Sequence, residues 1–274
     1  MAETRAMVLR AGWHAGRVRV TTSSRGGQDL VAPFDARVVW QEPDEVHVVL
    51  VPTMAQLLDG DHLDVRVVVE PGLRLRIVEV SGMVAYPGTG AGASYRSSMK
   101  VGAGAAVVWL AQPFVLAARS SVLRETTVSL DAGATACLRE ILVLGRSGEP
   151  SGAARISTRI DDADGPLLVE DLELGRGHVL PGILGAAKVV DQVLLAGVRP
   201  QVPHPDTFML AGPGALNRRL AASAHAAAAD ALAEDWAALA FDAVVGRCAD
   251  QPRPDQLRDA AVASSPPVPT ALST

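Results

Sequence analysis

The turn around Asp61 and His62 carries the residue types that bind a divalent cation. Asp59 and Asp64 lie close to this pair in the sequence. Carboxylate oxygens together with an imidazole nitrogen suit divalent ions of borderline softness. The sequence therefore indicates Asp61 and His62 as candidate metal ligands. The alternative interpretation of the same residues is a solvated acidic turn.

Glu140 is a carboxylate inside an apolar strand, predicted over Thr135–Leu144. If its side chain faces inward, it needs a partner or an aqueous cavity, because an unpaired buried charge is costly. Arg139 and Arg146 are the candidate partners, and either would make Glu140 half of a structural ion pair. Glu170, in a later strand, raises the same question.

The motifs of nucleotide binding and nucleophilic catalysis are absent from the sequence. It contains no P-loop, no GxSxG elbow, no CxxC and no HExxH. The six histidines are scattered, and no pair has the spacing that binds one metal from one element. We therefore expect a protein that is not an enzyme. The alternative is a β-scaffold enzyme whose site is built from loops, such as Gly145–Gly152 with Arg155.

The elements that must position these residues repeat along the chain. An alternating apolar strand, a glycine turn and a second strand occur in three copies, with the turn glycines about 30 residues apart. Period-two alternation puts one face of a strand on a core and the other in water. We therefore predict a mainly β fold, in which stacked hairpins form a layered, β-helix-like scaffold. The copies are Leu63–Glu79, Ser97–Leu110 and Thr126–Leu142.

The composition changes near the C-terminus. Residues 221–245 are rich in alanine and place Leu232, Trp236 and Leu239 on one helical stripe, with Ser223 as the expected N-cap. We assign residues 1–250 to a single β-rich domain that includes this helix. Residues 251–274 are rich in Pro, Ser and Ala and are predicted to form a flexible tail.

Charge and cysteine content narrow the class of protein. The net charge of −5 argues against a nucleic-acid partner, since phosphate binding favours a basic face. Two isolated cysteines do not make a disulfide framework, which favours a reducing compartment. We find no signal peptide and no apolar run long enough to span a membrane. These features predict a cytoplasmic protein without a membrane partner.

Several segments, taken in order, resemble the urease accessory protein D family (UreD, also called UreH). The family pattern has a Gly-Asp turn, a Pro-Gly hairpin, a Trp-Leu segment ending in Gln-Pro, and a Glu-Ile-Leu strand followed by Gly-Arg. Order and spacing agree over roughly residues 55–175, and departures at 55–59 and 145–149 mark a divergent member. The matching segments are Gly60–Val65, Val69–Leu75, Trp109–Leu116, Leu130–Ala134 and Arg139–Arg146.

This resemblance implies a non-catalytic scaffold for nickel delivery. Members of the family bind the accessory protein F, which recruits the nickel-carrying GTPase G, and they dock on apo-urease. Nickel is thought to travel through an internal channel of the D protein. For this chain the resemblance implies a transient nickel path that uses Asp61, His62 and Glu140, with no tightly bound cofactor.

The resemblance also suggests a role for the predicted helix. Its stripe of Leu232, Trp236 and Leu239 is the candidate surface for the F protein, and the alternative is a helix packed on its own sheet. A structural β-repeat module that binds other proteins is the remaining alternative for the whole chain.

Overall fold

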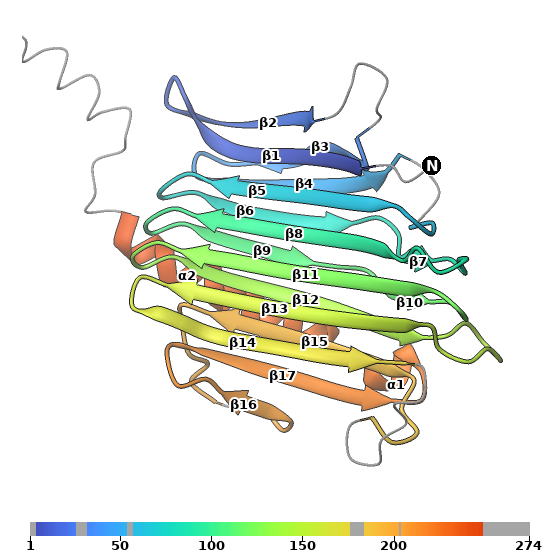
Figure 1. Ribbon diagram of the computed structural model, residues 1–274. Coiled ribbons are helices and arrows are strands. Elements are labelled where there is room, and N and C mark those ends of the chain that lie inside the picture. Colours follow the sequence, from blue (N-terminus) through green and yellow to red (C-terminus); the bar gives the residue numbers. More distant parts are fainter. Residues whose placement is uncertain (1–3, 26–31, 54–56, 176–183, 203, 249–274) are drawn as a thin grey trace, which may run out of the picture.

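The computed structural model describes residues 4–25, 32–53, 57–175, 184–202 and 204–248. The described part is a stack of strands in two facing layers, with helices against one layer (Figure 1). The first sheet has seven strands in the order β14-β13-β11-β8-β5-β1-β2. The second has ten, of which eight follow the order β16-β17-β15-β12-β9-β6-β4-β3. The predicted mainly β, layered scaffold is confirmed.

The three sequence repeats form solenoid coils, and the prediction that each copy is a hairpin is wrong. In each copy the first strand belongs to the first sheet and the second strand to the second sheet. Each strand pairs in parallel with its counterpart in the next copy, as β5 does with β8 and β6 with β9. The six strands are β5 (His62–Val69), β6 (Arg74–Glu79), β8 (Ala93–Val101), β9 (Ala106–Leu110), β11 (Ser121–Leu130) and β12 (Thr135–Leu144).

Glycines set the turn between the two sheets. Gly72, Gly104 and Gly133 have φ values of 73°, 60° and 67°, in the left-handed region that favours glycine. The turns also stack, since the Gly72 amide donates to the Ala103 carbonyl of the next coil at 3.0 Å. The turn glycines therefore mark the period of a solenoid.

Antiparallel strands flank the coils. β3 and β4 form a hairpin, and β13 and β14 form another around the acidic turn at residues 161–165. The flanking strands are β1 (Thr4–His14), β2 (Arg17–Arg25), β3 (Phe34–Gln41), β4 (Glu45–Pro52), β13 (Ala153–Asp162), β14 (Gly165–Leu174), β15 (Val189–Ala196), β16 (Thr207–Met209) and β17 (Gly214–Ala221).

Two short strands interrupt the return from the second sheet to the first. β10 (Phe114–Leu116) pairs in parallel with the end of β12 and with β7 (Met83–Ala85). β12 therefore pairs with β9 along its first half and with β10 along its second. The break between β9 and β10 lies beside Glu140, at the middle of β12.

The predicted helix is present as two pieces, α1 (Ala224–Ala227) and α2 (Asp230–Cys248). Ser223 is the N-cap of α1, but its side chain makes no capping hydrogen bond. α2 packs on the outer face of β9, β12 and β15 (Figure 1). The tail predicted over residues 251–274 lies outside the described residues.

Candidate functional site

A line of polar side chains crosses the apolar core between the two sheets. On the first sheet, Ser97, Thr126, Thr158 and Glu170 are successive neighbours in register on β8, β11, β13 and β14. On the second, Glu140, Gln192 and Arg218 are neighbours in the same way. We call this set the polar seam, and it comprises Glu79, Ser97, Arg124, Thr126, Glu140, Thr158, Glu170, Gln192 and Arg218.

Glu140 is the centre of the polar seam and is only 8% exposed. Its Oε1 forms an ion pair with Arg124 Nη2 at 2.9 Å and accepts a hydrogen bond from Thr126 Oγ1 at 3.2 Å. Its Oε2 accepts from Gln192 Nε2 at 2.9 Å. The Glu140 side chain therefore points into the core, a question that the sequence left open, and both of its carboxylate oxygens accept hydrogen bonds.

The pairing of Glu140 differs from the sequence prediction. Its partner is Arg124 on the facing sheet. Arg139 points away from Glu140, because successive residues of a strand point to opposite faces of the sheet. Arg139 pairs instead with Asp191 and Asp230, and Arg146 with Glu149 in its own loop.

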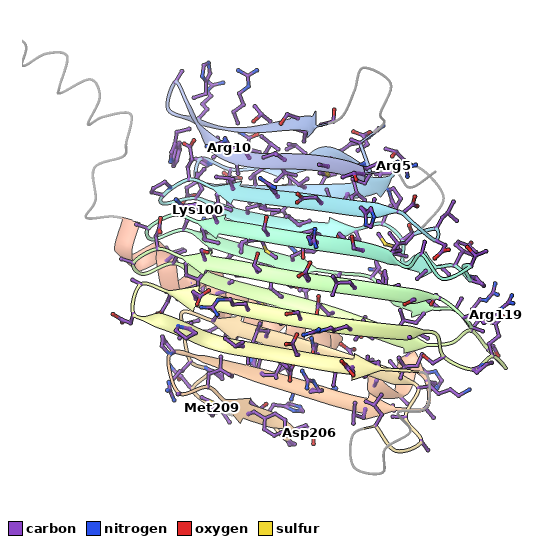
Figure 2. The ribbon with its side chains drawn as sticks, viewed as in Figure 1. Arg5, Arg10, Lys100, Arg119, Asp206 and Met209 are labelled. Carbon is purple, nitrogen blue, oxygen red and sulfur yellow. The ribbon has the colours of Figure 1, made fainter. Side chains whose placement is uncertain are left out.

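From Glu140 the polar seam continues to one end of the stack. Arg218 donates to Gln192 Oε1 at 2.7 Å and to Glu170 Oε1 at 2.9 Å, which joins β17 to β14 across the two sheets. The Arg218 and Glu170 side chains are 20% and 28% exposed. Figure 2 places Asp206 and Met209 at this same end of the stack. The polar seam therefore reaches solvent here.

At its other end the polar seam stops at a buried carboxylate. Glu79 accepts hydrogen bonds from Trp109 Nε1 and from the Gln112 amide, each at 3.0 Å. Burial raises the pKa of Glu79, and these donors with the Arg124 charge offset only part of that rise. The Gln112 amide is free to donate because the strand is broken between β9 and β10.

Two small cavities flank Glu140. One, of about 20 Å³, is lined by Tyr95, Trp109, Arg124 and Glu140 among others. The second, of about 10 Å³, lies toward Glu170, Gln192 and Arg218. A single water needs roughly 10–15 Å³ of such volume and polar partners, so each cavity is close to the size of one water molecule.

The structure does not bring Asp61 and His62 to Glu140. Asp61 accepts a hydrogen bond from the Leu58 amide at 2.9 Å and so closes its own turn. His62 is exposed on the outer face of the first sheet, where its Nδ1 lies 2.8 Å from Ser94 Oγ. Across the described residues, no three His, Cys, Asp or Glu side chains gather in a group that could hold a metal.

Asp59 is the residue of this turn with the most bonds. Its carboxylate accepts from the amides of Thr89, Ala91 and Gly92, at 2.7 to 3.3 Å. Desolvation works to raise the pKa of Asp59, but these donors outweigh it and lower that pKa below its usual value. The glycine-bearing loop at 88–92 is therefore held by a structural carboxylate.

The residues given for partner binding face the protein's own sheet. Leu232 and Trp236 are 7% and 3% exposed and pack with Val108 and Leu195, and Leu239 is partly buried at the same cluster. These side chains do not form a free surface. The outward face of α2 includes Ala231, Glu234, Asp235, Ala238 and Asp242.

A buried clamp fixes the start of α2. Asp191, 1% exposed, accepts from Arg139 Nε at 3.1 Å, from Arg139 Nη2 at 2.7 Å and from the Ala229 amide at 3.0 Å. Arg139 also donates to Asp230 at 2.6 Å, which lowers the pKa of that carboxyl. The clamp joins the helix start to β12 and β15.

The loops considered for an enzyme site form local pairs. Arg155 pairs with Asp171 at 3.2 Å on the exposed face of β13 and β14. In the acidic turn, Asp162 accepts from the amides of Asp164 and Gly165. The Cys137 thiol is buried beneath α2, and this burial raises its pKa to about 12, which makes it a poor nucleophile.

Sequence reasoning missed most of the polar seam. Arg124 is the clearest example, since it occupies an inward position of β11 between the buried residues Val122 and Thr126. Arg124 could have been identified from the sequence, because it is a charged residue at a position where the alternation of the strand predicts an apolar one. Glu79, Gln192 and Arg218 each lie at the equivalent inward position of their strands.

A two-sheet solenoid crossed by buried carboxylate and guanidinium groups defines a β scaffold with a polar interior. Among the described helices none is long and apolar enough to cross a membrane. The chain belongs to the UreD urease accessory protein family, whose model matches residues 9–256. Its role therefore lies in urease maturation.

Individual relatives agree with this assignment. Urease accessory protein UreD 1 of Streptomyces griseus is 43% identical over 198 residues, which cover 70% of this chain and 78% of that protein. Urease accessory protein UreD of Streptomyces avermitilis is 32% identical, with 68% and 77% covered. That of Frankia casuarinae is 37% identical, with 67% and 61% covered.

Proposed function

We propose that this protein is a non-catalytic scaffold that docks on apo-urease and guides Ni²⁺ through its polar seam. The nickel arrives with the accessory protein F and the GTPase G, as the family resemblance implies, and the ion is cargo that does not stay bound. The observation that carries the proposal is the unbroken set of polar contacts from Glu140 to the surface pair of Glu170 and Arg218.

The chemistry of the polar seam suits transit better than storage. Ni²⁺ needs several donor atoms to replace its hydration water, and neutral imidazole or carboxylate groups serve this purpose. Glu79, Glu140 and Glu170 supply oxygens one after another, and no group of three that would hold the ion forms among the described residues. An ion would exchange water for one carboxylate at a time, aided by the water-sized cavities beside Glu140.

Of the residues first given for the nickel path, Glu140 keeps its place in this proposal. Asp61 is less suited to this path than Glu140 is, because its carboxylate is engaged in its own turn. His62 is exposed on the outer face of the first sheet. The carboxylate proposed to join Glu140 is Glu170, at the solvent end of the polar seam.

Urease activation in cells that carry the remaining maturation genes tests the proposal. Glu140→Gln and Glu170→Gln should each lower activation several-fold, while the complex with apo-urease and the F protein still co-purifies. Glu173→Gln is the matched control, since Glu173 lies three residues from Glu170 in β14 but is exposed on the outer face. Unchanged activation in both inner variants would reject the path.

We also propose that the outward face of α2 contributes to binding of the F protein. Leu232 and Trp236 support this face indirectly, because they hold the helix on the sheet. The exposed residues available to a partner include Ala231, Asp235, Ala238 and Asp242.

A further inference from the structure

Arg124 places a permanent positive charge in the middle of the core. It is 7% exposed, and its guanidinium carbon lies 5.2 Å from the Tyr95 ring centre and 5.1 Å from that of Phe114. Burial alone would lower the pKa of Arg124, but Glu140, Tyr95 and Glu79 outweigh it, so the group stays charged. Two aromatic faces at this distance suit a cation that has lost its water.

Arg124 occupies one oxygen of Glu140. A carboxylate offers about four lone-pair sites, two on each oxygen. Oε1 takes three donor contacts, from Arg124 Nε at 3.1 Å, Arg124 Nη2 at 2.9 Å and Thr126 Oγ1 at 3.2 Å, whereas Oε2 takes one, from Gln192. A metal ion can therefore bind Oε1, or both oxygens together, only after Arg124 has left.

The charge of Arg124 acts in the same direction. A divalent ion beside Glu140 would lie next to a guanidinium group in a medium that screens poorly, and two positive charges repel strongly there. The ion must therefore replace the guanidinium at Glu140. The space beside Arg124, Tyr95 and Trp109 is close to the size of one water molecule, so the guanidinium leaves Glu140 only as neighbouring side chains rearrange.

We propose that Arg124 is the resident counter-ion of Glu140, and that a divalent cation binds Glu140 only when the guanidinium has moved off it. This inference rests on the proposed function, because it assigns a gate to the same path. Arg124 thereby selects for charge, since a monovalent ion gains no more from Glu140 than the guanidinium does. It also keeps the carboxylate neutralised when no cargo is present.

Binding of Ni²⁺ alone to the purified full-length chain tests this inference, with equilibrium dialysis as the measurement. Arg124→Gln should bind Ni²⁺ at Glu140 at least about tenfold more tightly than wild type does, which is measured as one more ion per chain at Ni²⁺ concentrations that leave the wild-type site empty. The double variant R124Q/E140Q should lose that ion. Arg155→Gln is the matched control, because Arg155 pairs with Asp171 on the exposed face, and it should bind as wild type does.

Loss of Arg124 leaves Glu140 buried without its cation, so folding of the variant is checked by near-ultraviolet circular dichroism. Should R124Q fail to fold, Arg124→Lys carries the test. A lysine holds Glu140 with one compact charge and without the planar fork, so its Ni²⁺ affinity should still exceed that of wild type. Wild-type affinity in the folded variant, or a gain that survives E140Q, would overturn the inference.

Urease activation in parallel separates this inference from the proposed function. A gained Ni²⁺ site in R124Q with normal activation by E140Q would reject the path but leave the counter-ion role. Impaired activation by E140Q with no gain of Ni²⁺ in R124Q would leave the path and reject the counter-ion role.

Discussion

Removal of the Asp191 carboxylate should destabilise the protein and release α2 from its sheet. Asp191 accepts three hydrogen bonds inside the clamp, two from Arg139 and one from the Ala229 amide. The variant Asp191→Ala leaves a guanidinium that is 10% exposed with Asp230 as its remaining carboxylate partner, and an amide without an acceptor.

The magnitude follows from these contacts. Breaking one partner out of a buried ion pair costs about 3–5 kcal/mol. Arg139 keeps its bond to Asp230, which is 71% exposed and can relax, so the low end of the range applies. We expect a loss of about 3 kcal/mol in the free energy of unfolding, or about 6–12 °C in melting temperature for a domain of this size.

Urea unfolding measures the total loss, and amide hydrogen exchange locates it. Exchange should accelerate most in α2, because the clamp fixes the helix start. Asp171→Ala is the control, since its pair with Arg155 is more than half exposed on both sides and its loss should leave the free energy of unfolding close to that of wild type.

A double variant separates the clamp from simple packing. Arg139→Met with Asp191→Leu removes both charges together and should be within about 1 kcal/mol of wild type, because a buried pair replaced by apolar groups is often neutral. The reasoning is refuted if Asp191→Ala costs no more than Asp171→Ala, or if the double variant is as unstable as the single one.

Two further predictions concern Glu79 and the outward face of α2. Because burial raises the pKa of Glu79 in the folded protein, the folded state holds its proton longer, and this residue's contribution to stability falls as the pH rises through and above the ordinary value of 4.5. As the pH rises through this range, the urea midpoint should fall less steeply for Glu79→Gln than for wild type. An equal slope in the two proteins would contradict a raised pKa of Glu79. Ala238→Arg, on the exposed face of α2, should reduce co-purification with the F protein while changing the free energy of unfolding by no more than about 0.5 kcal/mol. Arg159→Ala on the opposite sheet is the control for that binding, and equal co-purification of the two variants would remove α2 from the interface.

The strands could be predicted from the sequence, but the partners of the strands in the three repeats could not. Alternation marks a strand with one buried face whether its neighbour is the next segment of chain or the next repeat. The turn at Pro71-Gly72 allows either outcome, since a left-handed glycine serves a hairpin and a crossover between sheets alike. The repeat length of about 30 residues was the better guide, because parallel pairing of successive copies needs a full coil between paired strands.

For Glu140, the sequence pattern marked the residue itself but not its partner. The pattern identified a carboxylate in an apolar strand, and the structure places it in the core. Its proposed partner Arg139 could have been rejected from alternation alone, since neighbours on a strand face opposite ways. Arg124 could not be identified as the true partner without the fold, because it lies on the facing sheet and the two strands do not pair.

The helix shows a different limit. The stripe of Leu232 and Trp236 correctly predicted a helix with a buried side, but α2 is rich in alanine around its whole circumference. Helix periodicity states which residues share a face, and burial on the protein's own sheet or on a partner produces the same stripe. The contacts with Val108 and Leu195 decide for its own sheet.

The strand pair β12 and β15 links the two features on which these proposals depend. Residues 139 and 191 point outward to hold α2, and residues 140 and 192 point inward to the polar seam. The outward pair contributes to folding by fixing a helix. The inward set holds no helix, and a buried ionic network exchanged for apolar side chains is often neutral or stabilising. The presence of this polar line in an apolar core supports the path that we propose for Ni²⁺.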